Sequence, residues 1–147
     1  MYRDMASMKM YMADTGPLVT YTISELGMDG DWIYRSLLMD RLNTNEGMFV
    51  ENAIAQILNS SGHRLFYYSR SDPDTRRNSI EIDFLIMVRG DICPVEVKSS
   101  VSTKHVSLDK FREKFGKRMG QPHILCLKDV EEKDGILYLP LYMSQLL

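Results

Sequence analysis

Residues 80–100 (IEIDFLIMVRGDICPVEVKSS) contain two short apolar runs separated by a turn sequence, and this pattern most narrows the folds open to the chain. Each run has the length and the β-branched content of a strand, and Arg89-Gly90-Asp91 between them is typical of a tight turn. The segment therefore predicts a β-hairpin. Its expected strands are Ile80–Val88 and Ile92–Val97.

Three ionisable residues, Asp83, Glu96 and Lys98, interrupt these apolar runs. Because side chains alternate along a strand, Glu96 and Lys98 are expected on one face, and their distance from the turn makes Asp83 a near neighbour across the pair. Two carboxylates and an ammonium suit a divalent cation, Mg²⁺ or Mn²⁺, together with a phosphate group. The alternative is an ion pair on a solvated strand, or an active site that has lost its activity.

The remaining chain from residue 46 onward predicts an α/β domain of helix, three strands, helix and strand, with one further short strand at the end. Glu51 borders the apolar stripe of the first helix, where it is either solvated or reaches over the sheet. The expected elements are helix 47–59, an aromatic strand within 63–70, the hairpin, helix 107–118, strand 123–127, a charged loop at 128–134 and strand 136–141.

The first 45 residues are interpreted as an N-terminal strand and helical segment of the same domain, preceding a core at 46–147. Lys9–Ala13 has the character of a short strand that ends in the turn signal Asp14-Thr15-Gly16-Pro17. Two helical pieces are expected between Leu18 and Leu42, the second of them at Trp32–Leu42.

The net charge, the cysteines and the lengths of the apolar runs limit the classes of function open to this chain, but they do not identify one. The net charge of −2 gives no bulk electrostatic case for nucleic-acid binding, so such a case depends on local basic residues. The two cysteines lie in apolar runs and are expected to be buried free thiols, and no apolar run reaches the length of a membrane helix. These features favour a cytoplasmic protein. Candidate phosphate contacts are Arg70, Arg76, Arg77, Lys104, Lys110, Lys114, Lys117 and Arg118, although such charged residues more often form only a solvated surface.

Asp83 followed by Glu96-Val97-Lys98, within this order of helices and strands, resembles the PD-(D/E)xK nuclease superfamily. The resemblance implies a restriction-endonuclease-like αβββαβ core with a central mixed sheet flanked by helices. It also implies Mg²⁺-dependent hydrolysis of DNA phosphodiesters, with Asp83 and Glu96 as metal ligands, Lys98 as electrostatic helper and Glu51 as an auxiliary acid. One departure is that Ile82, rather than proline, precedes Asp83.

A closer resemblance covers nearly the whole chain and involves a bacterial and archaeal domain of unknown function that follows an AAA-type ATPase domain. The chain has no GxxxxGK[ST] loop, so the resemblance implies an ATPase partner in cis or in trans. The rival expectation is a catalytically inactive module that regulates or targets such an ATPase, or binds nucleic acid. The matching blocks are Glu51-Asn52-Ala53, Tyr67-Tyr68-Ser69-Arg70, Glu81-Ile82-Asp83-Phe84 and Val95-Glu96-Val97-Lys98-Ser99-Ser100.

Overall fold

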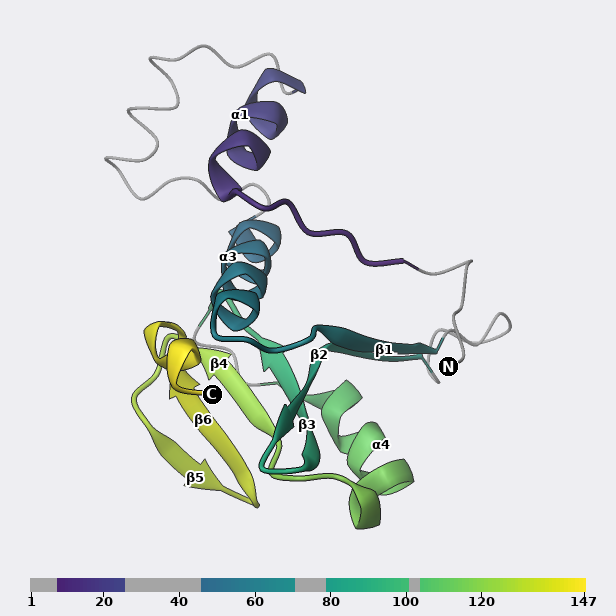
Figure 1. Ribbon diagram of the computed structural model, residues 1–147. Helices are drawn as coiled ribbons and strands as arrows, with labels where there is room; N and C mark the ends of the chain where they lie inside the picture. Colours follow the sequence, from purple (N-terminus) through teal and green to yellow (C-terminus); the bar gives the residue numbers. More distant parts are fainter. Residues whose placement is uncertain (1–7, 26–45, 71–78, 101–103) are drawn as a thin grey trace.

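The computed structural model describes residues 8–25, 46–70, 79–100 and 104–147. Among these residues, six strands form one mixed sheet in the order β1-β2-β3-β4-β6-β5 (Figure 1). Strands β3, β4 and β6 are parallel, whereas β1, β2 and β3 pair antiparallel and β5 pairs antiparallel with β6. The strands are β1 (Phe66–Arg70), β2 (Ile80–Val88), β3 (Asp91–Val97), β4 (His123–Cys126), β5 (Glu131–Lys133) and β6 (Ile136–Pro140).

Helices cover both faces of the sheet, which confirms the predicted α/β class (Figure 1). Helix α3 packs Ile54, Ala55 and Leu58 onto one face, and the short helix η3 lies on the same face. Helix α4 packs Leu108 and Phe111 onto the other. The bounds are α1 (Thr15–Glu25), α3 (Glu46–Ser60), α4 (Val106–Phe115), η2 (Gly116–Arg118) and η3 (Leu141–Leu146). Within the described part of the chain, no helix is long and apolar enough to cross a membrane.

The predicted hairpin is confirmed, with a turn one residue shorter than expected. Asp91 pairs with Val88, so Arg89 and Gly90 alone form the turn. Their φ angles are 52° and 94°, and two positive φ values in succession are typical of the turn that best fits the twist of a two-residue hairpin.

Strand β2 contains a β-bulge at the position of Asp83. Phe66 of β1 pairs with Leu85, but Tyr68 pairs with Ile82, so β2 has one residue more than β1 in this interval. As a result Ile82 belongs to the core under α4, while Phe84 belongs to the core under α3. The bulge reverses the alternation of side chains between the two faces, and Asp83 lies where the reversal occurs.

The N-terminal segment corrects one prediction. Lys9–Ala13 forms no strand, and the expected turn at Asp14 is instead the start of α1. The Asp14 carboxylate accepts a hydrogen bond of 2.8 Å from the Gly16 amide, and Pro17 is tolerated because it lies in the first helical turn. The expected second helical piece at Trp32–Leu42 lies outside the described residues.

The charged segment predicted as a loop at 128–134 is wrong in part, because it contains strand β5. Asp134 and Gly135 have φ angles of 53° and 73°, which form a second tight hairpin turn that brings Glu131–Lys133 against β6. All three residues of β5 are exposed. A short, charged edge strand of this kind discourages pairing with other chains.

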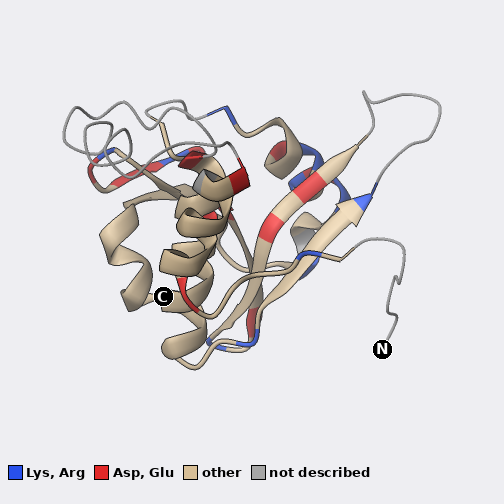
Figure 2. Ribbon diagram, turned by 90° about the horizontal axis from the view of Figure 1, so that it is seen from above, with Lys and Arg blue, Asp and Glu red and all other residues tan. Residues whose placement is uncertain are grey.

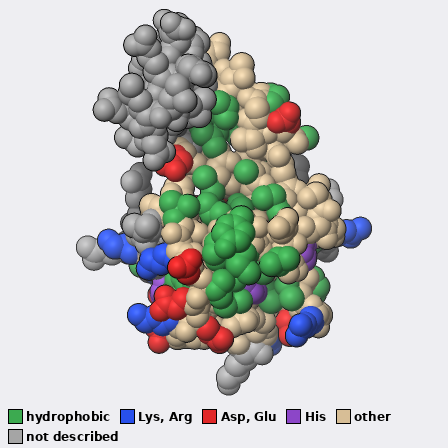
Figure 3. Space-filling view, turned by 90° about the vertical axis from the view of Figure 1, so that its left-hand side faces the viewer, with side chains coloured by type: hydrophobic (Ala, Val, Ile, Leu, Met, Phe, Trp, Pro, Cys, Tyr) green, Lys and Arg blue, Asp and Glu red, His purple; other side chains and the backbone are tan. Residues whose placement is uncertain are grey.

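The side of the molecule seen in Figure 3, which is the left of Figure 1, gathers hydrophobic side chains. Helix η3 packs partly buried side chains, among them Leu141 and Met143, against the α3 core. Tyr142 and Leu146 of the same helix are exposed. The helix therefore covers the core while leaving part of its own apolar surface at the exterior.

His123 predicts a loss of stability in mild acid. Its imidazole is buried, which lowers its pKa below the ordinary value of 6.5. As the pH falls through that value, the unfolded chain takes up a proton that the folded protein does not. The free energy of unfolding should therefore decrease, by at most about 1.4 kcal/mol per pH unit. Urea unfolding at pH 7.5 and 5.5 measures this change, and His123→Leu should reduce it. An unchanged pH dependence in the variant would contradict the assignment.

Candidate functional site

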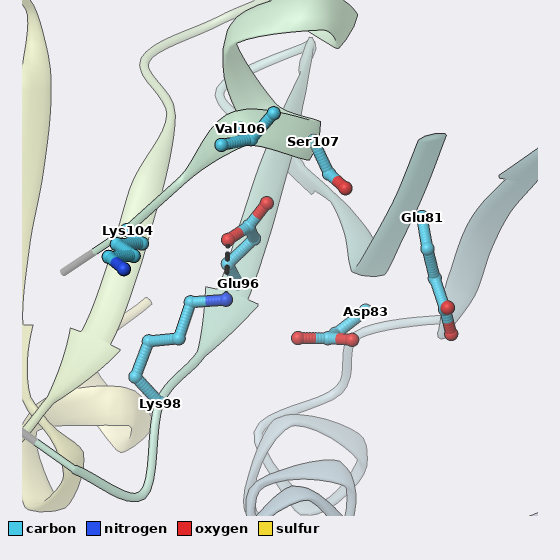
Figure 4. A pocket seen from close by; sticks show the side chains of 7 residues that line it. All are labelled: Glu81, Asp83, Glu96, Lys98, Lys104, Val106 and Ser107. Carbon is cyan, nitrogen blue, oxygen red and sulfur yellow. Dashed lines mark ion pairs between the residues drawn. The ribbon is translucent and has the colours of Figure 1, made fainter. Parts of the chain in front are cut away.

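A cavity of about 340 Å³ opens where β2 and β3 cease to pair (Figure 4). The last pair of the hairpin on this side is Phe84 with Val95, so the next residues in register are Asp83 and Glu96. The first turn of α4 closes the cavity from the other side. The lining residues are Glu81, Asp83, Glu96, Lys98, Lys104, Val106 and Ser107.

The carboxylate of Asp83 is held by the backbone of the neighbouring strand. Its Oδ2 accepts a hydrogen bond of 3.0 Å from the Val97 amide. This bond joins β2 to β3 just beyond their last paired residues, Phe84 and Val95. The orientation of Asp83 is therefore fixed by the sheet.

Glu96 is a buried acid at the base of the cavity, with 2% of its surface exposed. Lys98 Nζ lies 2.9 Å from Glu96 Oε2, which confirms that these two side chains project to the same side of β3. Glu96 Oε1 has no hydrogen-bond partner among the described residues. Burial raises the pKa of Glu96; the Lys98 ammonium offsets part of this rise, and the Asp83 carboxylate adds to it.

Lys9 is a site residue that the sequence reasoning missed. Its Nζ lies 3.0 Å from Glu51 Oε1, 3.1 Å from Glu81 Oε1 and 3.0 Å from Asp83 Oδ1. Burial alone would lower the pKa of the Lys9 ammonium, but the Asp83 and Glu51 carboxylates outweigh burial and raise it. No local pattern marks Lys9, since its partners lie more than forty positions away in the chain.

Residues 8–14, here called the N-terminal strap, lie against α3 through specific side-chain contacts. The Tyr11 hydroxyl donates a hydrogen bond of 2.6 Å to Glu51 Oε1, and its ring lies 5.4 Å from that of Phe84. Burial and the Glu51 carboxylate raise the pKa of the Tyr11 phenol. The buried Asn52 accepts a bond of 2.8 Å from the Met12 amide. Of the two orientations expected for Glu51, the structure shows the one directed toward the sheet.

The predicted phosphate contacts do not converge on this cavity. Lys114 donates a hydrogen bond of 2.9 Å to the Tyr68 hydroxyl, and Lys110 donates one of 3.4 Å to the Ser79 carbonyl. Arg70 is exposed at the end of β1, and of this basic set only Lys104 lines the cavity among the described residues. Acidic and basic segments are interspersed in Figure 2. Arg76 and Arg77 lie outside the described residues.

The donor set at the cavity suits a hard divalent cation of the Mg²⁺ type. In the part of the chain that the structure describes, no three carboxylate, imidazole or thiolate side chains form a metal site by themselves. Mg²⁺ commonly takes one or two carboxylates and completes its shell with water and phosphate oxygens. Asp83 and Glu96 can supply two carboxylates, and the buried Oε1 of Glu96, which has no partner among the described residues, is a position that a cation could fill.

The same cavity could accept a phosphate group on the side of α4. Among the described residues no side chain caps the N-terminus of this helix, and backbone amides of a first helical turn favour an anionic ligand. Lys98 and Lys104 contribute positive charge to the lining. The arrangement therefore places carboxylates on the strands opposite anion-binding groups on the helix.

Comparison with known protein families matches residues 46–143 to a domain of unknown function, DUF4143. No curated protein matches the chain, and no solved structure matches it. The matched region runs from the first residue of α3 into η3, and so contains every strand of the sheet and most of the residues around the cavity. The match confirms the prediction that this chain is part of a domain family of unknown function. The chain therefore belongs to the DUF4143 family.

Proposed function

We propose that this domain is a Mg²⁺-dependent nuclease that hydrolyses DNA phosphodiesters on a restriction-endonuclease-like core. The observation that carries the proposal is the buried Glu96 carboxylate, whose Oε1 is unpaired and which shares a cavity with Asp83 and Lys98. Lys98 offsets the charge of Glu96 from the side of Oε2, but a buried Oε1 without a partner among the described residues stays costly. A divalent cation, beside an ammonium that can meet developing negative charge, accounts for this arrangement.

Each residue of the cavity has a role in this proposal. When bound, Mg²⁺ or Mn²⁺ would stabilise negative charge on the scissile phosphate and lower the pKa of the attacking water. Asp83 and Glu96 hold the cation, and the backbone bond from Val97 keeps Asp83 in position. Lys98 stabilises the charge that develops on the phosphate oxygens. Lys104 and the first turn of α4 orient the phosphate.

Glu51 does not line the cavity and acts as an auxiliary acid through its contacts with other residues. It contacts Lys9 and Tyr11, and Lys9 in turn contacts Asp83. The proposal extends to an AAA-type ATPase as the partner, in cis or in trans, and to a cytoplasmic setting, both of which come from the resemblance in sequence.

A second candidate is a catalytically inactive module that regulates or targets its ATPase or binds nucleic acid. One observation favours it: Lys9 already neutralises part of the charge of Glu51, Glu81 and Asp83 without any metal. In that case the ion pairs stabilise the fold, and the cavity has no catalytic activity.

Metal binding by the purified chain separates the two candidates. Titration calorimetry with Mn²⁺ should detect binding to the wild type, and Glu96→Gln should bind at least about tenfold more weakly because it loses a charged ligand. Glu131→Gln, an exposed acid on β5, is the matched control and should bind as the wild type does.

Cleavage of single-stranded, duplex and branched DNA with Mg²⁺ then tests the reaction itself. The wild type should cut at least one of the three substrates, and Glu96→Gln should cut none. Indifference of both proteins to metal and to DNA would reject the nuclease and favour the inactive module.

A further inference from the structure

We propose that Lys9 and a divalent cation compete for the same carboxylates, so that the N-terminal strap regulates metal loading. The inference rests on the proposed metal site and adds a regulatory element to it. Its starting point is that Lys9 contacts Asp83 and Glu81, two acids that also line the cavity.

Asp83 has few free positions for a metal while Lys9 is bound. Its Oδ2 accepts the Val97 amide at 3.0 Å, and its Oδ1 lies 3.0 Å from Lys9 Nζ. A cation that binds Asp83 through Oδ1 must therefore share that atom with the ammonium or displace it. Glu96 is the other ligand, and its ion pair is with Lys98, so displacement of Lys9 leaves that pair intact.

Glu81 connects the strap to the cavity. It lines the cavity together with Asp83 and Glu96, and it also lines a second hollow of about 310 Å³ between the strap and α3. Its side chain is 60% exposed, and Lys9 Nζ lies 3.1 Å from its Oε1. Lys9 thus lies at the boundary between the two spaces, close to where a cation would enter.

Electrostatic repulsion opposes simultaneous binding of the Lys9 ammonium and a divalent cation at Asp83. The Lys9 ammonium is partly buried, with 18% of its side chain exposed, so solvent screens it less than a surface lysine. Repulsion between this ammonium and a divalent cation at a neighbouring oxygen is strong at such short range. Removal of the Lys9 charge should therefore tighten metal binding.

Release of the strap would uncover Phe84, against which the Tyr11 ring lies, but it would break no hydrogen bond between strands. None of its described residues belongs to a strand, and Met12 is held instead by side chains of α3. Asn52 accepts from the Met12 amide at 2.8 Å, and Gln56 donates to the Met12 carbonyl at 3.2 Å. Loss of these bonds would therefore not require a change in the strand register.

The first test compares the Mn²⁺ affinity of the full chain and three variants by calorimetry. Lys9→Met, which keeps the length of the side chain and removes its charge, should bind at least about tenfold more tightly, within the usual range of coupling between two sites. Lys9→Arg should bind no more tightly than the wild type. Lys133→Met removes a charge from the exposed strand β5, away from the cavity, and should change the affinity less than about threefold.

The second test needs no variant. Amide hydrogen exchange of the wild type, followed by mass spectrometry, should show faster exchange in peptides that contain the Met12 amide when saturating Mg²⁺ is added. Exchange in peptides of β4 should stay unchanged. If Lys9→Met fails to fold, this measurement alone decides.

The outcomes separate this inference from the proposed function. Tighter binding in Lys9→Met, including the case in which only that variant binds, supports the competition. Equal or weaker binding in Lys9→Met, equal tightening in Lys133→Met, or unchanged exchange of Met12 at saturating metal overturns it and leaves the metal site standing. Absence of binding in every variant overturns the metal site, and the competition with it.

Discussion

Replacement of Lys98 by methionine should lower the rate of DNA cleavage by a factor of about 100 to 1,000, the usual effect of removing one charged or hydrogen-bonding group that stabilises a transition state. Lys98 Nζ is 2.9 Å from Glu96 and faces the cavity, so methionine keeps the packing of the side chain and removes only its charge. The rate should be measured at pH 8 with saturating Mg²⁺, because loss of Lys98 also raises the pKa of Glu96 further.

Two comparisons make this result specific. Mn²⁺ binding by Lys98→Met should persist, since Asp83 and Glu96 remain. Lys133→Met, an exposed lysine on β5, should cleave at the wild-type rate. Cleavage by Lys98→Met within a few-fold of the wild type would exclude Lys98 from the reaction.

Replacement of Phe84 by alanine should lower the free energy of unfolding by about 3–5 kcal/mol, the range for removal of a buried aromatic side chain. Phe84 has 0% of its surface exposed, and it lies in the core under α3 with Tyr11 of the strap against its ring. The variant leaves a cavity at the residue that follows the bulge. Urea unfolding followed by circular dichroism measures the change.

Phe66→Ala is the matched control for this prediction. Phe66 lies on the edge strand β1 and is 45% exposed, so its removal should cost about 1 kcal/mol or less. Equal losses in the two variants would contradict the placement of Phe84 in the core and of Phe66 at the surface.

The sequence predicts most of the fold because the signals that define it are local. The apolar stripe of α3, the alternation in β3 and the turn at Arg89-Gly90 each lie within a few residues, and each element forms within a few residues of its predicted position. β5 escapes prediction because its three residues are charged and exposed, and its pairing depends on the turn that follows.

The candidate site is predictable to the extent that it depends on one hairpin. Counting from the turn places Asp83 opposite Glu96, and alternation places Lys98 beside Glu96. Lys9 is not predictable in this way. It reaches Asp83 across 74 positions of the chain, through the packing of the strap on α3, and no spacing in the sequence encodes that contact. The roles assigned to these residues stay predictions.

The bulge in β2 makes the number of residues in this strand as informative as their identity. Ile82 and Phe84 are both large apolar residues, two positions apart. They pack on opposite faces of the sheet only because the bulge adds one residue to β2 between them. A variant shortened by one amino acid here would keep almost the same composition, yet it would send a hydrophobic side chain outward and turn the acid away from its partner. Homologous or engineered forms of this strand should thus tolerate exchange of side chains far better than any change of length.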